Sequence, residues 1–451
     1  MSTGHAGRMA LLVGGGPAPG INGVISAVTI EAIEQGLDVI GFLDGFKWLV
    51  EGKAEHYAPP PITDHDKASS LKYVPLTIDA VKAINLRGGS ILRTSRTNPT
   101  KTPEMMANVL SVMRRLNVTR LVTIGGDDTA YSGSQVYQAA AGAIRVAHVP
   151  KTIDNDLPLP ESVPTFGFET ARQVGVGIVR NLAEDAKTTS RWYLIISMGR
   201  AAGHLALGIG KAAAATLTII PEEFKGRHVT LDEICDLIAC SVLKRRSRGL
   251  HYGIAVMAEG LLESIGQESL ESLMRGDKLG RYGDIIKDDH GHLRLGEVEF
   301  GRMVKECLEG KLAEVGISTT LVDKDLGYEL RCADPIPFDA EYTRDLGYGA
   351  VKFLRGEESA KYGAIISIVG GEMKPLPFET MLNPETKRMQ TRRVNVNGEG
   401  YESARRYMLR LEKRDLKEPD RLAKLAREAK MTPERFVERF GYLVEHDPWS
   451  R

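Results

Sequence analysis

Two short segments carry the residue types that phosphoryl-transfer chemistry needs. Residues 125–129 read GGDDT, and residues 151–156 read KTIDND. Two carboxylates after a Gly-Gly turn suit a magnesium ion that holds phosphate, because hard cations take oxygen ligands. A lysine followed by a threonine and an acidic cluster suits charge neutralisation beside a general base. Together the two segments predict phosphoryl transfer.

Each segment follows an apolar run that has the character of a buried parallel strand. These runs are residues 121–124 and 144–149. Open α/β sheets bind their ligands just beyond the carboxyl ends of their strands. The glycines and carboxylates are therefore expected at the ligand-binding edge of one sheet.

A third segment, residues 14–20 with the sequence GGGPAPG, follows a predicted strand at 10–13. A strand, a glycine-rich turn and a helix together place backbone amides at a helix N-terminus, which favours anions. The dinucleotide pattern Gly-x-Gly-x-x-Gly fails because Pro19 stands where the third glycine belongs, and no Gly-Lys-Ser/Thr follows as in a Walker loop. Phosphate binding is favoured, and a nicotinamide-binding oxidoreductase stays open as an alternative.

Strand-like and helix-like segments alternate through most of the chain, which predicts parallel sheets with helices on both faces. Apolar residues at helical spacing from Ile21 to Ile33 predict a helix that ends at Gly36. The expected fold class is α/β, with two Rossmann-like three-layer domains, mostly parallel sheets and a helical C-terminal extension. Further segments are a helix at 205–215 and strands at 37–42, 193–197, 216–220, 252–257 and 362–369.

Three other stretches differ from this alternating pattern. Residues 59–61, all proline, predict a loop, and residues 287–295 predict a hairpin within an insertion at about 276–300. Beyond about residue 400 the chain is charged and helical, with a helix that starts at Thr432-Pro433-Glu434 and stops at Gly441. This tail is expected to serve packing or oligomer contacts.

The composition limits the function classes. The 451 residues include 59 basic and 59 acidic ones, so no global field favours nucleic acid or a membrane surface. Residues 1–9 lack an apolar signal core, and no run of eighteen apolar residues occurs. The four cysteines match no zinc pattern, and Cys235 and Cys240 are expected in a core. A cytoplasmic protein is expected.

The three segments and one more, Met198-Gly199-Arg200, occur in the order found in the phosphofructokinase family, and the chain resembles that family from about residue 8 to about residue 390. The resemblance implies Mg²⁺-assisted transfer of a phosphoryl group to O1 of fructose 6-phosphate. It also implies a homodimer or homotetramer, with Arg191 as a candidate residue acting across a subunit interface.

The resemblance also assigns roles to single residues. Asp127 matches the magnesium-associated carboxylate, with Asp156 as a second candidate. Asp154 matches the general base that takes the proton of the sugar 1-hydroxyl, and Lys151, Asp128 and Arg200 complete the catalytic set. Donor-binding residues are Gly15, Gly16, Gly126, Asp128, Thr129 and Arg96. Substrate-binding residues are Thr152, Asp154, Arg191, Met198, Gly199, Arg200, Glu259, Tyr328 and Arg331, and many relatives have His in place of Tyr328.

Asp128 bears on the choice of donor. ATP-using members carry glycine at this position, which leaves room for the α-phosphate, whereas a carboxylate would fill that space and repel the phosphate. Asp128 could alternatively be only the N-cap of the following helix. Asp128 and Lys151 in combination resemble the pyrophosphate-dependent branch of the family.

The expected domains follow the family pattern. Residues 1–165, completed by about 334–358, would bind the phosphoryl donor and Mg²⁺. Residues 166–333, completed by about 359–395, would bind the sugar phosphate, and 396–451 would form the helical extension. Three alternatives stay open: an ATP-dependent enzyme, a pyrophosphate-dependent kinase of another sugar phosphate such as sedoheptulose 7-phosphate, and a non-catalytic regulatory subunit.

Overall fold

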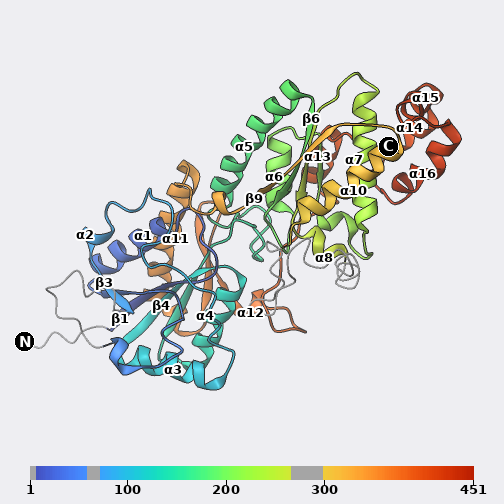
Figure 1. Cartoon of the computed structure of the whole chain (residues 1–451). Helices are drawn as coiled ribbons and strands as arrows, with labels where there is room; N and C mark the ends of the chain where they lie inside the picture. Colours follow the sequence, from blue (N-terminus) through green and yellow to red (C-terminus); the bar gives the residue numbers. More distant parts are fainter. Residues whose placement is uncertain (1–6, 58–71, 266–297, 451) are drawn as a thin grey trace, which may run out of the picture. The chain divides into compact units, whose positions relative to one another are not determined.

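The computed structural model describes residues 7–57, 72–265 and 298–450, and the predicted loop at 59–61 and hairpin at 287–295 lie outside these residues. The described chain divides into two compact units (Figure 1). Unit 1 comprises described residues up to Ala171 together with Tyr328–Arg392, and unit 2 comprises the rest. Within the residues just given, the chain passes from one unit to the other after Ala171, before Tyr328 and after Arg392.

Unit 1 is built on a seven-stranded sheet with the order β11-β10-β5-β4-β1-β2-β3. The five inner strands are parallel, and the two edge strands, β3 and β11, run antiparallel to their neighbours. Its strands are β1 (Arg8–Val13), β2 (Asp38–Phe42), β3 (Tyr73–Leu76), β4 (Val118–Gly125), β5 (Arg145–Pro150), β10 (Ala364–Val369) and β11 (Glu372–Pro377). Its helices are α1 (Ile21–Glu34), α2 (Ile78–Val81), α3 (Pro103–Arg115), α4 (Asp127–Ala139), α11 (Pro337–Arg355) and α12 (Phe378–Met381), with short 3₁₀ turns at Ala54–Tyr57, Tyr328–Leu330 and Glu357–Ala360.

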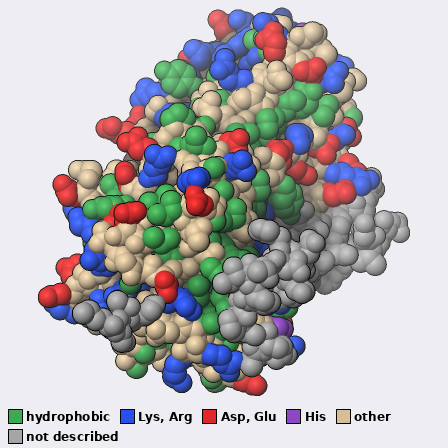
Figure 2. All heavy atoms as spheres, turned by 90° about the vertical axis from the view of Figure 1, so that its left-hand side faces the viewer, with side chains coloured by type: hydrophobic (Ala, Val, Ile, Leu, Met, Phe, Trp, Pro, Cys, Tyr) green, Lys and Arg blue, Asp and Glu red, His purple; other side chains and the backbone are tan. Residues whose placement is uncertain are grey.

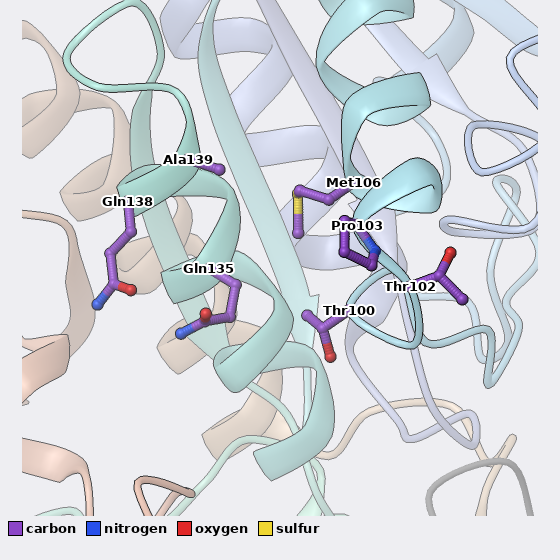
Figure 3. A pocket seen from close by; sticks show the side chains of 7 residues that line it. All are labelled: Thr100, Thr102, Pro103, Met106, Gln135, Gln138 and Ala139. Carbon is purple, nitrogen blue, oxygen red and sulfur yellow. The ribbon is translucent and has the colours of Figure 1, made fainter.

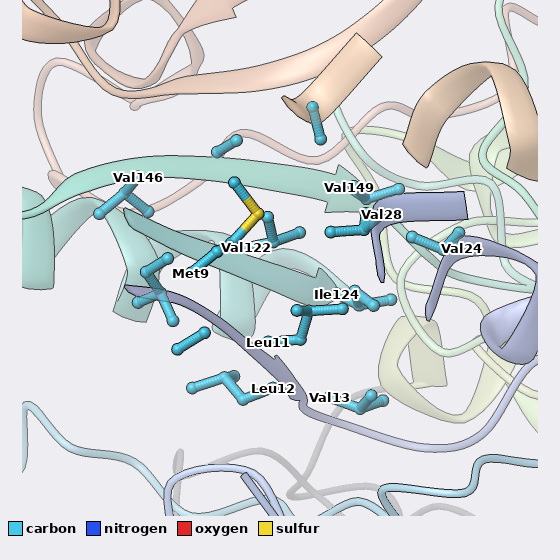
Figure 4. Close-up of a cluster of buried hydrophobic side chains, with 14 of the residues drawn as sticks. Met9, Leu11, Leu12, Val13, Val24, Val28, Val122, Ile124, Val146 and Val149 are labelled. Carbon is cyan, nitrogen blue, oxygen red and sulfur yellow. The ribbon is translucent and has the colours of Figure 1, made fainter. Parts of the chain in front are cut away.

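The core of unit 1 lies on both faces of the central strands. Figure 4 shows side chains of β1, β4 and β5 meeting Val24 and Val28 of α1. The central strands are buried along most of their length and are mainly apolar, as expected of strands that helices cover on both faces. The predicted strands are confirmed: the apolar run at 121–124 lies within β4, and the run at 144–149 covers most of β5.

Unit 2 contains a fully parallel four-stranded sheet with the order β7-β8-β6-β9. Its strands are β6 (Arg191–Ser197), β7 (Leu217–Ile219), β8 (Gly253–Ala258) and β9 (Thr320–Leu326). Its helices are α5 (Phe168–Thr189), whose first turn belongs to unit 1, α6 (His204–Ala212), α7 (Leu231–Arg246), α8 (Leu261–Ile265), α10 (Phe300–Glu314), α13 (Glu399–Tyr407), α14 (Lys413–Lys417), α15 (Pro419–Glu428) and α16 (Pro433–Glu445), with a 3₁₀ turn at Pro221–Phe224.

The C-terminal helices are part of the unit 2 core. Phe436 and Phe440 are buried in the same apolar cluster as residues of α7 and α10. The Leu409 N–H donates to the Thr216 carbonyl (2.8 Å), which places this segment beside the start of edge strand β7. The predicted packing role of the tail is confirmed, and Cys235 and Cys240 are buried in this core as predicted.

Two predictions about helix ends had different outcomes. Gly36 adopts the left-handed conformation (φ +78°) just after α1, as predicted for a helix stop. The predicted stop at Gly441 is wrong, because α16 continues to Glu445 and Gly441 is buried. The helix is held by tertiary packing of side chains such as Phe436 and Phe440, which overrides the low helix propensity of one glycine.

Charges of both signs cover the surface. Figure 2 shows basic and acidic side chains interspersed on one face, in keeping with their equal numbers in the sequence. No helix among the described residues is both long and apolar enough to cross a membrane.

Candidate active site

Three glycine-rich or acidic segments follow neighbouring strands of the unit 1 sheet. The turn at 14–20 follows β1, the GGDDT segment follows β4, and the KTIDND segment follows β5. Because β5, β4 and β1 are adjacent and parallel, the three segments meet at one edge of the sheet. The sheet thereby gathers residues that lie about 130 positions apart in the sequence.

Backbone hydrogen bonds hold the glycine turn in place, and two cationic side chains contact it. Gly14 N–H donates to the Ile124 carbonyl, and Gly15 N–H donates to the Ser95 carbonyl, both at 2.9 Å. Lys151 Nζ donates to the Gly16 carbonyl. A Cβ on Gly16 would lie 3.3 Å from the Arg331 guanidinium carbon, so this arginine lies directly on the turn.

Lys151 is a buried cation, with 4% of its surface exposed. Burial, and after it the positive charge of Arg331, lowers the pKa of Lys151 to about 8. The carboxylates of Asp154, Asp156 and Asp127 act in the opposite direction, which shows that these acids surround the ammonium group. The site therefore places a lysine, an arginine and three carboxylates around one glycine turn.

Helix α4 begins at Asp127, and Gly126 is its N-cap residue. Asp127 and Asp128 lie in its first turn, so the alternative that Asp128 is the N-cap is wrong. The N-terminus of α4 presents backbone N–H groups at the same sheet edge. The Asp128 carbonyl accepts a hydrogen bond from the Ser132 hydroxyl (2.8 Å), a contact within the helix.

Thr129 is buried against two glycines. A Cβ on Gly14 would lie 2.4 Å from Thr129 Oγ1, and a Cβ on Gly125 would lie 2.3 Å from Thr129 Cβ. Both glycines are therefore required by the close packing of Thr129. This gives Thr129 a structural role in addition to the donor-binding role expected for it.

The loop after β5 is fixed by residues that the sequence interpretation did not single out. Asp154 N–H donates to Thr152 Oγ1 at 3.0 Å, and Asn155 has a left-handed backbone (φ +56°). Arg392 clamps this loop from a distant part of the chain: its Nε donates to the Asn155 carbonyl (3.1 Å), and its backbone N–H donates to the Asp156 carbonyl (2.7 Å). No local signal marks Arg392, because its partners lie more than 200 residues earlier.

Two predicted residues lie at the rim of this group. Arg96 is exposed and follows Ser95, which pairs with the glycine turn. Tyr328 is 68% exposed, and the Arg331 guanidinium lies 5.0 Å from its ring centroid.

The predicted residues of unit 2 form a second group, at the carboxyl ends of β6 and β8. Gly199 N–H donates to Glu259 Oε2 (3.2 Å), and Gly260 N–H donates to the Gly199 carbonyl (3.2 Å). A Cβ on Gly260 would lie 2.3 Å from the Arg200 carbonyl oxygen. The segment that contains Met198, Gly199 and Arg200 is thus interlocked with the one that contains Glu259.

Arg191 does not belong to this second group. It is the first residue of β6, whereas Met198 directly follows the last residue of that strand. Seven residues of extended chain span about 23 Å. Arg191 Nε lies 3.7 Å from Asp185 Oδ2 at its own end of the strand.

A pocket of about 460 Å³ lies between α3 and α4, apart from these groups. Figure 3 shows Met106 and Pro103 of α3 on one side of the pocket and α4, which carries Gln135, Gln138 and Ala139, on the other. Its lining contains no charged side chain, so it does not suit pyrophosphate. The lining residues are Thr100, Thr102, Pro103, Met106, Gln135, Gln138 and Ala139.

Comparisons with known proteins show the family to which the chain belongs. Residues 8–354 match the family model described as phosphofructokinase. Two relatives, both named pyrophosphate–fructose 6-phosphate 1-phosphotransferase, are similar along nearly the whole chain. The protein from Thermotoga maritima is 51% identical over 98% of this chain and 99% of its own, and the one from Naegleria fowleri is 47% identical over 97% and 96%.

Solved structures support the fold. The pyrophosphate-dependent phosphofructokinase of Nitrosospira multiformis superposes with a TM-score of 0.63 at 17% identity and covers 89% of this chain and 91% of its own. The phosphofructokinase of Saccharomyces cerevisiae superposes with a TM-score of 0.62 at 19% identity, covering 97% of this chain and 50% of its own. The predicted α/β fold is confirmed.

Proposed function

The chain belongs to the phosphofructokinase family, and we propose that it transfers a phosphoryl group reversibly between pyrophosphate and O1 of fructose 6-phosphate. Relatives at 51% and 47% identity carry the name of this reaction and match over nearly their whole length. These names favour pyrophosphate and fructose 6-phosphate over ATP or another sugar phosphate. The observation in this chain that carries the proposal is the convergence of Lys151 and Arg331 on Gly16, beside the N-terminus of α4.

This convergence suits a small, highly charged donor. Two cations packed onto one glycine turn repel each other, and this repulsion is the second cause, after burial, of the lowered pKa of Lys151. A bound polyanion relieves the repulsion. Pyrophosphate offers several negative charges in a small volume and has no nucleoside to supply binding energy. Lys151, Arg331 and the amides of α4 would stabilise the phosphate that leaves. Asp128 would exclude a third, α-phosphate by occupying its space and by like-charge repulsion.

Asp154 is the proposed general base. It lies close enough to Lys151 to affect the lysine pKa, and the loop that carries it is fixed by Thr152 and Arg392. Asp154 takes the proton of the sugar 1-hydroxyl as that oxygen forms a bond to the nearer phosphorus. The bond from this phosphorus to the bridging oxygen breaks, and phosphate leaves. The reverse reaction returns the proton from Asp154 to the sugar oxygen.

Mg²⁺ fits the carboxylates of unit 1. Among the residues with described positions, no group of three or more His, Cys, Asp or Glu side chains could hold a metal ion by itself. Mg²⁺ is usually bound through one or two carboxylates together with substrate phosphates, so the proposed ligands, Asp127 and Asp156, suffice. When bound, Mg²⁺ neutralises charge on the transferred phosphoryl group.

Unit 2 would supply the sugar contacts. The Glu259 carboxylate would accept hydrogen bonds from sugar hydroxyls, and Arg200 would contact phosphate oxygens through its planar fork. Met198 and Gly199 shape the same segment. Tyr328 remains our proposed contact to the 6-phosphate. Arg331, predicted from the resemblance as a second such contact, lies against Gly16, and we assign it to the donor instead.

We also propose a cytoplasmic homodimer or homotetramer. Arg191 stands about 23 Å along β6 from Met198, which supports a role for Arg191 in the site of another subunit rather than its own. The four cysteines are free, as a reducing compartment allows.

The direct test compares donors. Purified protein is assayed with fructose 6-phosphate and Mg²⁺, with pyrophosphate or ATP in parallel reactions, and with Asp154→Asn as the control. We expect turnover with pyrophosphate, at least a hundredfold less with ATP, and a loss of kcat of about 10²–10⁴ in Asp154→Asn. Equal or greater turnover with ATP would overturn the donor assignment, and no turnover with either donor would overturn the reaction.

A further inference from the structure

A buried histidine is hydrogen-bonded to the GGDDT turn. His148 lies on β5 with none of its surface exposed, opposite Thr123 in the parallel register with β4. Its Nδ1 lies 2.9 Å from Thr123 Oγ1, and its Nε2 lies 3.0 Å from the Gly125 carbonyl oxygen. Both ring nitrogens therefore have partners on the neighbouring strand.

The chemistry of these partners fixes the direction of both hydrogen bonds. A carbonyl oxygen can only accept, so Nε2 must carry the proton. Burial lowers the pKa of His148 to about 3, and the neutral ring then has only a lone pair at Nδ1. The Thr123 hydroxyl must donate to that lone pair. The Thr123 hydroxyl therefore donates to His148, and His148 donates to the Gly125 carbonyl.

Gly125 needs such a partner because a glycine is unavoidable there. Thr129 packs so closely that a Cβ at residue 125 would lie 2.3 Å from Thr129 Cβ. Two successive glycines, 125 and 126, give the backbone wide freedom, and a freely rotating peptide would leave the start of α4 poorly defined. The Gly125 carbonyl accepts both His148 Nε2–H and the Lys151 backbone N–H (2.8 Å), which holds the peptide plane.

We propose that His148 is a positioning residue for the phosphoryl donor: by holding the Gly125 carbonyl, it orients the N–H of Gly126 and the first turn of α4 toward pyrophosphate. The C=O and N–H of one trans peptide point in opposite directions, so a fixed Gly125 carbonyl fixes the Gly126 N–H. Asp127 follows directly as the first residue of α4. This inference rests on the proposed function, because it assumes that the α4 turn binds the donor.

The alternative is that His148 only fills space in the core. A space-filling residue needs no matched donor and acceptor, and an apolar side chain of the same size would serve as well. The two interpretations differ in what they predict for donor binding when the hydrogen bond is removed but the volume is kept.

The test uses a substrate analogue whose binding is measured without turnover. Affinity for methylenediphosphonate with Mg²⁺ is measured by titration calorimetry for wild type, His148→Leu, His148→Gln and Thr123→Val, with kcat and KM for both substrates and melting temperatures. His148→Leu should weaken analogue binding at least fivefold and raise the pyrophosphate KM, with the fructose 6-phosphate KM changed less than twofold. His148→Gln, which can place a donor near the position of Nε2, should recover most of the affinity.

Val146→Ala is the matched control, because Val146 lies two residues earlier on the same face of β5 and is fully buried. It should lower the melting temperature without changing analogue affinity. If His148→Leu does not fold, Thr123→Val decides, since it keeps the side-chain volume and should weaken analogue binding two- to threefold. Unchanged analogue affinity in the folded variants would overturn the positioning role. Failure of the wild type to bind the analogue would instead overturn the proposed function.

Discussion

At the scale of the residue, the site depends on groups held in unfavourable electrostatic surroundings. Lys151 is buried next to Arg331, and its pKa is lowered by burial first and by that charge second. Such an arrangement opposes stability and is typical of sites that bind highly charged ligands.

The lowered pKa of Lys151 predicts a pH limit on donor capture. The free enzyme loses the Lys151 proton as the pH rises through about 8, and the neutral amine no longer attracts pyrophosphate. We expect kcat/KM for pyrophosphate to fall about tenfold per pH unit above that value. Lys151→Arg stays charged, so its profile should lack this limb in the same buffers. A limb that persists in Lys151→Arg would assign the titration to another group or to pyrophosphate itself.

The same residue predicts a gain in stability when it is replaced. A lysine whose folded pKa lies below its unfolded value of about 10.5 destabilises the folded state below pH 8, and the effect fades between pH 8 and 10.5. Lys151→Met should therefore raise the free energy of unfolding at pH 7 by on the order of 1–3 kcal/mol while abolishing activity. Chemical denaturation at pH 7 and pH 10 checks this, and a destabilised variant at pH 7 would contradict it.

Asp128 predicts a change of donor. Asp128→Gly removes the carboxylate from the first turn of α4 and opens the space beside the donor turn. The ratio of kcat/KM for ATP to that for pyrophosphate should rise at least tenfold. Asp128→Asn separates the two causes, because it removes the charge and keeps the volume. An unchanged ratio in both variants would show that Asp128 does not set donor choice.

Single residues were predicted from the sequence where a motif surrounded them. Asp127, Lys151 and Asp154 stand in runs of chemically distinctive neighbours, and the structure gathers them around Gly16. His148 was missed because one histidine in an apolar strand is normally a core residue. Arg392 was missed because its role exists only through contacts with residues more than 200 positions away.

At the scale of the element, the loop after β5 is the feature that most needs support from elsewhere. The Arg392 Nη1 donates to the carbonyls of Val163 (2.7 Å) and Pro160 (3.0 Å), in addition to its contacts with Asn155. A planar guanidinium is the side chain that can serve several carbonyls at once. The loop that carries Asp154 is thus anchored at both of its ends by one residue.

This clamp predicts that lysine cannot replace Arg392. Arg392→Lys keeps the charge but loses the fork, so kcat should fall tenfold or more as the loop loosens. Hydrogen exchange should show faster amide exchange in residues 154–163. Arg388→Lys, an exposed arginine of the same segment, is the control. Normal kcat with fast exchange would separate loop order from catalysis and contradict the prediction.

Elements with strong apolar patterns were predicted well. Strands that form only through pairing with a neighbouring strand were not. The inner strands β1, β4, β5 and β6 lie where the apolar runs placed them. Strand β9 carries Asp323, Lys324 and Asp325 at a sheet edge, and its polar sequence gave no strand signal. The antiparallel edges of the unit 1 sheet likewise depend on pairing partners that no local pattern reveals.

At the scale of the whole molecule, the C-terminal segment completes unit 2. Arg410 is buried and forms a two-pronged ion pair with Glu223 (2.5 and 2.9 Å), and it also donates to the Thr218 carbonyl of β7. The segment therefore connects the helical tail to the sheet through charges as well as through Phe436 and Phe440. The sequence showed that the tail was helical, but its attachment depends on these distant contacts.

Replacing one partner of this ion pair should destabilise the protein more than replacing both. Arg410→Met leaves a buried carboxylate and should cost about 3–5 kcal/mol of unfolding free energy, whereas Arg410→Met with Glu223→Met should cost less. Arg406→Met, which loses an exposed pair with Glu402, should change stability by less than about 1 kcal/mol. Urea unfolding gives all three values, and a double variant as unstable as the single one would contradict this account.

The strand order of the unit 1 sheet also has a consequence during synthesis on the ribosome. Strand β5 lies inside the sheet only because β10 pairs with it, and β10 is made more than 200 residues later. Until then the nascent chain carries β5 as an unpaired apolar edge, the kind of edge on which chains aggregate. Slow translation between residues 150 and 364 should therefore lower the yield of native enzyme, and chaperones that cover exposed strands should restore it.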